Sequence, residues 1–356
     1  MTWLDEITPR HIQDLVPYAS ARREASSGEV WLNANENPYI GSTPVGLSQL
    51  NRYPEFQPEP LTEGYARYAG VRQEQVLVTR GIDEGIDLLI RGFCRPGEDN
   101  IIYTPPTYGM YKICAETNNI GALPAPLKPD WSVDVQGVLK QLPSSKLIYL
   151  CSPNNPTGSL LDKGDLRKII KAAYGKALVV VDEAYVEFTP ESSTVSLLAK
   201  YPNLVVMRTL SKAFGLAGLR CGFLLASPEI IQVLQKVSAP YPIPVPVVDI
   251  ASEALSEKGI DSMMRDVETL NKDRNKLSDI LKEFSCIRQI YPSSANFILF
   301  QVKDAPAVMR FLLDRGVVIR NQSRQLGLDN TLRVSVGTEN ENEIFIQNMK
   351  AYEASL

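Results

Sequence analysis

The sequence predicts an α/β protein, with a large domain built on a mostly parallel sheet between helices and a smaller α+β domain after it. Between about residues 75 and 226, short apolar runs alternate with segments of helical periodicity. The runs are continuous rather than alternating, which is typical of parallel strands covered on both faces. The proline cluster APYPIPVP at 239–246 then predicts a boundary, because proline fits neither a helix interior nor a central strand.

The expected elements follow in chain order. Strands of the large domain are predicted at 76–78, 100–103, 147–150, 177–181, 204–207 and 222–225. The first leads into a helix with apolar positions at Ile82, Ile86, Leu89, Ile90 and Phe93. After the prolines we expect a long helical stretch to about Lys282, a strand at 295–302, a helix at 308–313, strands at 316–320 and 331–336, and a final helix at 339–352. The predicted domains are 46–240 and 241–356, with the arm 1–45 packing beside the smaller one.

Composition excludes several classes of protein. Net charge is −4 with no basic stripe, so we expect no nucleic-acid partner and no anionic membrane surface as partner. The start, MTWLDEITPRHIQDL, lacks the pattern of a signal peptide, and no apolar run reaches the length of a membrane span. The five cysteines are scattered without a CxxC pair, which indicates reduced thiols in a cytoplasmic protein and no metal site.

The chain has a single histidine, His11, in a polar N-terminal segment. A Ser-His-Asp triad needs a histidine at the chemistry, and zinc sites normally use several His or Cys ligands. Because His11 is expected to be a surface residue, the proton carrier of an enzyme built on this chain is expected to be another group. A lysine with a lowered pKa is the next candidate.

Polar residues follow three consecutive predicted strands. SPNNPTG supplies Asn155, DEAYVEF supplies Asp182 and Tyr185, and RTLSK supplies Ser211 and Lys212. Ligands of doubly wound sheets bind at the carboxyl ends of the strands, so these side chains are expected to meet at one sheet edge. In the adjacent turn TRGIDEGID the backbone N–H groups of Gly81, Ile82 and Asp83 are expected to point outward at a helix N-terminus, as in an anion site.

This set of residues fits pyridoxal 5′-phosphate, which needs a lysine for its Schiff base, an acid beside its pyridine nitrogen and donors for its phosphate. Lys212 and Asp182 supply the first two. We expect Asn155 and Tyr185 to hydrogen-bond the ring 3′-oxygen. The phosphate is expected to bind Ser211, Arg220 and the Gly81 turn, while Tyr108 of TPPTYGMY stacks on the ring.

Each residue alone has a simpler reading. Asp182 can be a helix N-cap, Tyr185 a core residue and Asn155 a turn residue, while a lysine at a strand end is usually a solvated charge. Their joint occurrence, each at a strand end, favours the cofactor site.

The segments SPNNPTG, VVDEAY and SKAFGLAGLRCGF resemble those of fold-type I, aspartate-aminotransferase-like enzymes that use pyridoxal phosphate. More narrowly, LNANENP, NRYPE, TRGIDEGIDLLIRGF, PPTYGMY and LRVSVGT resemble the histidinol-phosphate aminotransferase family, over nearly the whole chain. The resemblance implies that Lys212 forms the Schiff base, that Asp182 pairs with the pyridinium and that Asn155 and Tyr185 bind O3′. It implies transamination between L-histidinol phosphate and 2-oxoglutarate in histidine biosynthesis, giving imidazole-acetol phosphate and L-glutamate.

The resemblance also implies roles outside the strand ends. Arg333 and Arg320 become candidates for the substrate's phosphate or carboxylate. Tyr53 of NRYPE would reach the cofactor phosphate of the other subunit of a homodimer. Tyr18 lies near the substrate phosphate or serves packing, and the sequence leaves both open.

Three alternatives share these features. One is an aromatic or broad-specificity aminotransferase of the same fold, and another is a lyase resembling threonine-phosphate decarboxylase. The third, a cofactor-sensing regulator, needs an attached DNA-binding module, and the roughly 75 residues before the core pattern show no recognition-helix pattern and no basic excess.

Overall fold

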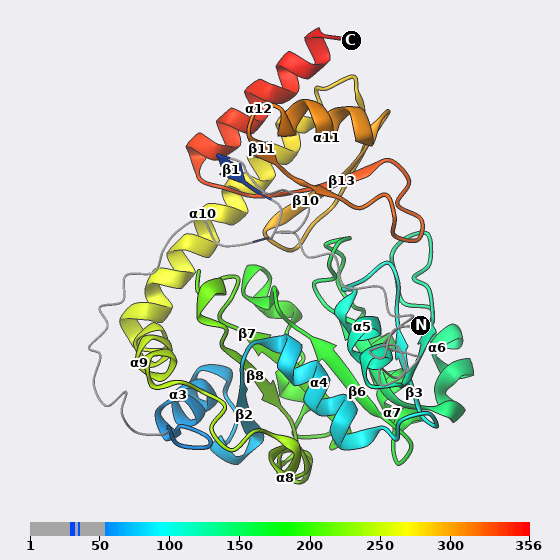
Figure 1. Ribbon diagram of the computed structural model, residues 1–356, viewed down its shortest axis with the longest axis vertical. Coiled ribbons are helices and arrows are strands. Elements are labelled where there is room, and N and C mark those ends of the chain that lie inside the picture. Colours follow the sequence, from blue (N-terminus) through cyan, green and yellow to red (C-terminus); the bar gives the residue numbers. More distant parts are fainter. Residues whose placement is uncertain (1–28, 33–34, 36–53) are drawn as a thin grey trace, which may run out of the picture.

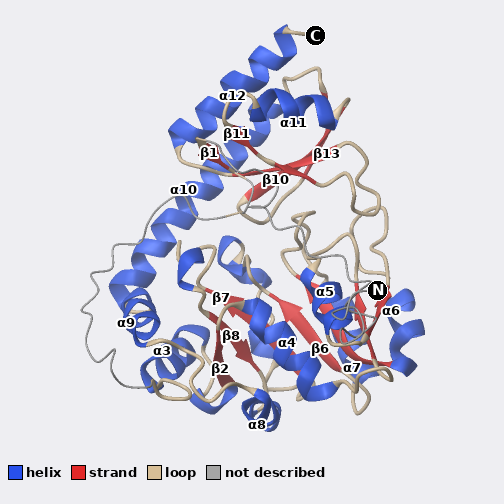
Figure 2. Ribbon diagram, in the orientation of Figure 1, coloured by secondary structure: helices blue, strands red, loops and turns tan. Residues whose placement is uncertain are grey.

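The computed structural model describes residues 29–32, 35 and 54–356 of the chain. Two bodies of secondary structure, each with its own sheet and hydrophobic core, make up this part (Figure 1). Figure 2 shows the larger sheet enclosed by helices and the smaller sheet beneath two helices at the other end of the molecule.

The larger sheet has seven strands in the order β2-β8-β7-β6-β5-β3-β4. Its strands are β2 (Val76–Thr79), β3 (Asn100–Tyr103), β4 (Gly121–Pro124), β5 (Ser145–Cys151), β6 (Leu178–Asp182), β7 (Leu204–Thr209) and β8 (Gly222–Leu225). Neighbours from β4 to β7 are parallel, while β8 runs antiparallel to both β7 and β2. The prediction of a mostly parallel sheet is confirmed, and its six predicted strands are all present. The edge strand β4 was missed because its residues are exposed or half-buried and form no apolar run.

Helices cover this sheet. They are α3 (Glu59–Ala69), α4 (Ile82–Phe93), α5 (Met110–Thr117), α6 (Val135–Gln141), α7 (Lys163–Ala173) and α8 (Pro228–Val237). Helix α4 packs on β5, β7 and β8 and beside α5 and α8, whereas α7 packs on β6. The helix predicted from the spacing after Ile82 is confirmed, because it begins at Ile82 and buries Ile86, Leu89 and Ile90.

The smaller body holds a four-stranded antiparallel sheet in the order β12-β13-β10-β9. Its strands are β9 (Ile287–Tyr291), β10 (Phe297–Val302), β12 (Arg320–Asn321) and β13 (Thr331–Ser335). Strand β11 (Val317–Val318) pairs instead with β1 (Val30–Trp31), and α11 (Ala305–Leu313) and α12 (Glu339–Ala354) complete the body. Strand β9 is not predicted from the sequence, because its residues are half-buried or exposed and form no apolar run.

The stretch after residue 238 forms two helices, α9 (Val245–Ala254) and α10 (Glu257–Leu281), rather than the single helical stretch predicted. Ser256 divides them, since its hydroxyl caps α10 by accepting from the N–H of Gly259. The proline cluster is likewise not wholly outside helices. Pro246 sits in the first turn of α9, where a missing N–H costs nothing.

The two cores meet along α10. Met263, Val267 and Leu270 from its first half join the larger core, and Leu277 and Leu281 from its second half join the smaller one. The boundary predicted at 240/241 stays a prediction, as does the one at 45/46, which lies outside the described residues. Of the predicted arm, Val30 and Leu32 belong to the smaller core.

No helix in the described part of the chain is long and apolar enough to cross a membrane. All five cysteines, Cys94, Cys114, Cys151, Cys221 and Cys286, are buried free thiols.

Candidate active site

The carboxyl ends of β5, β6 and β7 carry five of the predicted site residues. Asn155 follows β5, Asp182 ends β6, and Lys212 follows β7. Register explains this convergence, because Cys151 pairs with Asp182 and Asp182 pairs with Met207 across neighbouring parallel strands. Lys212 Nζ lies 5.8 Å from the centre of the Tyr185 ring.

Asp182 is buried, with two donors on its carboxyl group. Tyr111 Oη donates to Oδ2 at 2.5 Å, and the N–H of Ala184 donates to Oδ1 at 3.0 Å. Burial raises the pKa of Asp182 to about 6, although these two hydrogen bonds oppose the shift. No lysine or arginine of the described chain forms an ion pair with this carboxyl group. Asp182 is therefore a buried acid suited to an external cation.

A second polar group surrounds the hydroxyl of Tyr185. Asn155 Nδ2 donates to Tyr185 Oη at 3.3 Å, and Asn35 Nδ2 donates to the same oxygen at 3.1 Å. Arg333 of β13 donates through Nη1 to Asn155 Oδ1, which connects the smaller sheet to the end of β5. Burial raises the pKa of Tyr185, so its hydroxyl is protonated near neutral pH.

Asn35 was not predicted as a site residue, yet it is almost fully buried. Its N–H donates to Ser335 Oγ at 2.8 Å, and Asn296 Nδ2 donates to its carbonyl oxygen at 2.9 Å. Asn35 lies in the segment LNANENP, and its contact with Tyr185 depends on the three-dimensional fold.

The predicted anion site lies where β2 turns into α4. Gly81 has φ 80°, a backbone conformation that favours glycine, and a Cβ atom on it would lie 2.5 Å from Arg220 Nη2. Arg220 Nη2 donates to Asp83 Oδ2 at 3.4 Å, and Tyr108 Oη donates to Asp83 Oδ1 at 2.8 Å. The half-exposed guanidinium thus stands beside the N-terminus of a helix, a combination that binds phosphate.

One detail of the anion site differs from the prediction. The N–H of Gly81 donates to the carbonyl of Thr79 at 2.8 Å, so the expectation that it points outward is wrong. Ile82 and Asp83 open α4, where backbone N–H groups have no partner within the helix. Ser211, which follows β7, is buried, and its hydroxyl accepts from Thr209 Oγ1 at 2.9 Å.

The remaining predicted residues fall into two groups. Arg320 pairs with Arg333 across β12 and β13, so the two arginines are neighbours in the smaller sheet. Tyr18 and Tyr53 lie outside the described residues. Tyr108 stands edge-on to Tyr111, with ring centres 5.7 Å apart.

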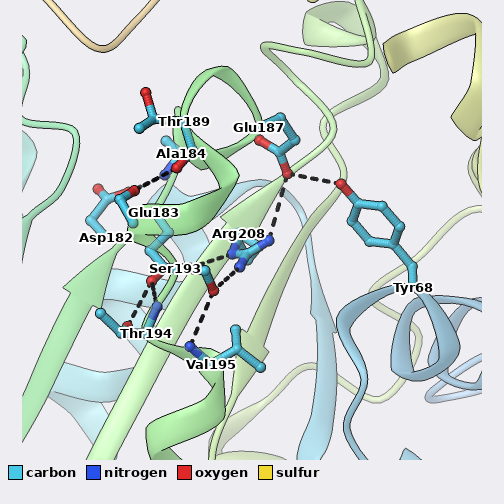
Figure 3. A network of polar contacts seen from close by, with 11 residues as sticks. Tyr68, Asp182, Glu183, Ala184, Glu187, Thr189, Ser193, Thr194, Val195 and Arg208 are labelled. Atoms are coloured by element: carbon cyan, nitrogen blue, oxygen red, sulfur yellow. Dashed lines mark hydrogen bonds and ion pairs between the residues drawn. The ribbon is translucent and has the colours of Figure 1, made fainter.

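Figure 3 shows a polar network around Arg208, close to Asp182. Arg208 of β7 donates through Nε to Glu183 Oε2 at 2.7 Å, and its Nη1 lies 3.7 Å from Glu187 Oε1. Thr194 donates to Glu183 twice, through its N–H and its hydroxyl. Tyr68 Oη donates to Glu187 Oε1 at 3.5 Å. The sequence analysis does not predict this network, although Arg208, a charged residue in the apolar strand LVVMRT, indicates a buried partner of opposite charge.

Comparisons with known proteins agree with this geometry. Residues 29–349 match the model of the family "Aminotransferase class I and II". The chain belongs to this family and is accordingly a pyridoxal-phosphate-dependent aminotransferase. A histidinol-phosphate aminotransferase of Pectobacterium atrosepticum is 50% identical to it over 343 residues, which are 96% of each protein.

Solved structures establish the same fold. The histidinol-phosphate aminotransferase of Sinorhizobium meliloti in complex with pyridoxal-5′-phosphate aligns with a TM-score of 0.86 and 22% identity over 98% of both chains. L-threonine-O-3-phosphate decarboxylase of Porphyromonas gingivalis aligns with a TM-score of 0.73 and 20% identity, over 85% of this chain and 91% of that one. The fold is therefore shared between a transferase and a lyase.

The residues present fit the cofactor. Asp182 is a buried carboxyl group that forms no ion pair in the described chain, as a pyridinium partner needs. The close approach of Arg220 to Gly81 at the start of α4 suits a phosphate. Pyridoxal phosphate supplies the electron sink that lets an amino acid lose the proton on its α-carbon.

Proposed function

We propose that this protein transaminates L-histidinol phosphate with 2-oxoglutarate, yielding imidazole-acetol phosphate and L-glutamate, as a cytoplasmic enzyme of histidine biosynthesis. The 50% identity to a histidinol-phosphate aminotransferase over 96% of both chains is the observation that carries the choice of substrate. Asp182, Tyr185, Asn155 and Lys212, gathered at the ends of three strands, support the reaction class.

In this proposal Lys212 is both the residue that holds the cofactor and the catalytic base. Its Nζ takes the proton from the α-carbon of L-histidinol phosphate in the first half-reaction. In the second half-reaction it returns a proton to the α-carbon of the product glutamate. An amine replaces histidine here, in keeping with a chain whose one histidine is His11.

The other residues bind and orient. Asp182 holds the pyridine nitrogen in its protonated form, and the hydroxyl of Tyr185 and amide of Asn155 bind the 3′-oxygen. Arg220, Ser211 and the start of α4 at Gly81, Ile82 and Asp83 hold the cofactor phosphate, while Tyr108 stacks on the ring. Arg220 contacts Asp83 through Nη2 at 3.4 Å and has further N–H groups that can bind the phosphate.

Substrate recognition is assigned to the smaller sheet. Arg333 and Arg320 are neighbours across β12 and β13, so their guanidinium groups form a paired cationic surface for either a phosphate or a carboxylate. Both substrates carry such an anion, which explains how one site accepts the two in turn. Tyr18 is a candidate for the same substrate phosphate, and Tyr53 for the cofactor phosphate of the neighbouring subunit in a homodimer.

The test is a half-reaction. The purified protein, loaded with pyridoxal phosphate, is mixed with L-histidinol phosphate without a keto acid while its visible absorption spectrum is recorded. We expect loss of the band of the lysine-bound cofactor and gain of the pyridoxamine phosphate band, reversed by 2-oxoglutarate.

Other outcomes discriminate the alternatives. A response to phenylalanine or aspartate but not to L-histidinol phosphate would indicate a broad-specificity aminotransferase. Release of carbon dioxide from threonine phosphate would indicate the lyase. A protein that gives no visible band with pyridoxal phosphate would contradict the whole proposal.

A further inference from the structure

Tyr111 of α5 makes the shortest contact to the carboxyl group of Asp182. Its Oη lies 2.5 Å from Asp182 Oδ2, a distance typical of a hydroxyl donating to an ionised oxygen. Tyr111 is itself fully buried. The comparisons and the sequence motifs give this tyrosine no role, and it is distinct from Tyr108, the residue expected to stack on the cofactor.

The ring of Tyr111 is fixed on two sides. It stacks on Tyr149 of β5 with ring centres 4.8 Å apart and planes inclined by 11°, and Tyr108 meets it edge-on at 5.7 Å. Tyr149 Oη donates elsewhere, to the carbonyl of Ile86 at 3.3 Å. Because the ring is held in a dense aromatic stack, its hydroxyl is a preoriented donor.

The hydrogen bond favours one protonation state of Asp182. Burial holds the pKa of Tyr111 well above its ordinary value, so its hydroxyl keeps the proton and donates it. Burial raises the pKa of Asp182 to about 6, and the bond from Tyr111 is the largest contribution that lowers it. Without this bond, more of the carboxyl group is neutral near physiological pH, and a neutral acid attracts a pyridinium weakly.

We propose that Tyr111 is a positioning residue for the cofactor, whose hydroxyl orients Asp182 and keeps it ionised for the pyridine nitrogen. This inference rests on the proposed role of Asp182. The other titratable groups coupled to Asp182 are Asp83 of α4, Glu183 next to it in the chain, Cys151 and Tyr149 of β5, and Tyr185. None of these groups carries a positive charge, and the two hydrogen bonds from Tyr111 and Ala184 both favour the carboxylate.

The chain offers a matched control for this proposal. Tyr111→Phe removes the hydroxyl that reaches Asp182, whereas Tyr149→Phe removes a buried hydroxyl from the same stack that reaches the backbone. A packing role for the stack predicts similar effects of the two changes. The positioning role predicts an effect of Tyr111→Phe alone on cofactor affinity.

The experiment measures the dissociation constant of pyridoxal phosphate from apoproteins of the wild type, Tyr111→Phe, Tyr149→Phe and Asp182→Asn. We expect Tyr111→Phe to weaken binding about 10-fold, which is typical for loss of a hydrogen bond to a charged group. Tyr149→Phe should stay within about 2-fold of wild type. Binding to Tyr111→Phe should also fall off at a higher pH on acidification than binding to the wild type, because its Asp182 protonates more readily.

The outcomes separate this inference from the proposed function. If Asp182→Asn binds the cofactor more weakly than the wild type while Tyr111→Phe binds it equally well, the role of Tyr111 is overturned and the proposed function is left intact. If Asp182→Asn binds the cofactor as tightly as the wild type, the role of Asp182 is overturned, and the inference about Tyr111 with it. If Tyr111→Phe does not fold, 3-fluorotyrosine at position 111 keeps the ring and makes the hydroxyl more acidic. A shift in cofactor affinity then supports the proposal, and an unchanged affinity contradicts it.

Discussion

Asp182 and Glu183 are neighbours in sequence, both buried, yet they lie in opposite chemical surroundings. Glu183 is bonded to Arg208 and receives two further hydrogen bonds from Thr194. Asp182 forms no ion pair in the described chain, and burial raises its pKa to about 6. Consecutive residues at a strand end point to opposite faces of the sheet, which separates the two groups.

The two carboxyl groups differ in whether the protein itself supplies a cation to pair with them. On the Glu183 face the protein supplies its own cation, because Arg208 forms ion pairs with Glu183 and Glu187, and the network connects the ends of β6 and β7 (Figure 3). On the Asp182 face the described chain forms no ion pair, and in the proposed function the cation is the pyridinium of the cofactor. Changes on the first face should therefore alter stability, and changes on the second should alter catalysis and cofactor binding.

The largest effect is expected from Lys212→Ala. Loss of the amine removes the proposed base, and kcat should fall about 10⁴-fold, at the upper end for general acid–base catalysis. Thermal unfolding followed by circular dichroism should stay near that of the wild type. Lys200→Ala, at an exposed position, is the control and should retain full activity. A Lys212→Ala protein that keeps more than about a tenth of the wild-type kcat would rule out this role.

Arg208→Met should act on stability. The substitution leaves Glu183 and Glu187 buried without their cation, and the free energy of unfolding should fall by about 3–5 kcal/mol. Urea denaturation measures this change, with the exposed Arg324→Met as a control expected within about 0.5 kcal/mol of wild type. Equal stability of the two variants would show that the network does not hold the strand ends.

Arg333→Lys tests the second buried arginine, which donates to the amide of Asn155. A lysine lacks the planar fork that binds a phosphate through two N–H groups, so KM for L-histidinol phosphate should rise about 10–100-fold. The free energy of unfolding should change less than in Arg208→Met. Arg310→Lys, on the exposed side of α11, should leave KM unchanged. A KM for Arg333→Lys equal to wild type would assign the substrate anion elsewhere.

The smallest effect concerns pH. Burial raises the pKa of Glu187 to about 7 from an ordinary 4.5, so the folded protein binds this proton more tightly than the unfolded chain. That contribution to stability is complete below about pH 4.5 and is lost as pH rises through about 7. Glu187→Gln should therefore flatten the decline in stability between about pH 5 and 7, with a difference in slope of about 1.4 kcal/mol per pH unit at most. Urea denaturation of the apoprotein at several pH values measures it, and a slope equal to that of the wild type would contradict the assignment.

Much of the site could be predicted from the sequence because strand ends are easily located. Continuous apolar runs placed Asn155, Asp182 and Lys212 at the ends of three strands, and parallel pairing brings such ends together. Tyr111 could not be assigned in the same way. It lies on a helix, where its contact with Asp182 depends on how α5 packs against the sheet.

Other misses have similar physical causes. The strands β4 and β9 are poorly buried, so they lack the apolar runs that identify strands. The contact of Asn35 with Tyr185 joins residues 150 positions apart, and no local pattern reports it. The prediction that the N–H of Gly81 points outward was wrong, because this N–H donates to the carbonyl of Thr79 in a tight turn.

The difference between Asp182 and Glu183 is tested most directly by measuring whether the ring nitrogen of the bound cofactor is protonated. Pyridoxal phosphate labelled with ¹⁵N in the ring would be bound to the wild type, to Asp182→Asn and to Glu183→Gln, and the nitrogen chemical shift recorded at about pH 8. We predict a protonated ring nitrogen in the wild type and in Glu183→Gln, and a neutral one in Asp182→Asn. A neutral nitrogen in the wild type, or a protonated one in Asp182→Asn, would contradict the assignment of Asp182 as the partner of the cofactor.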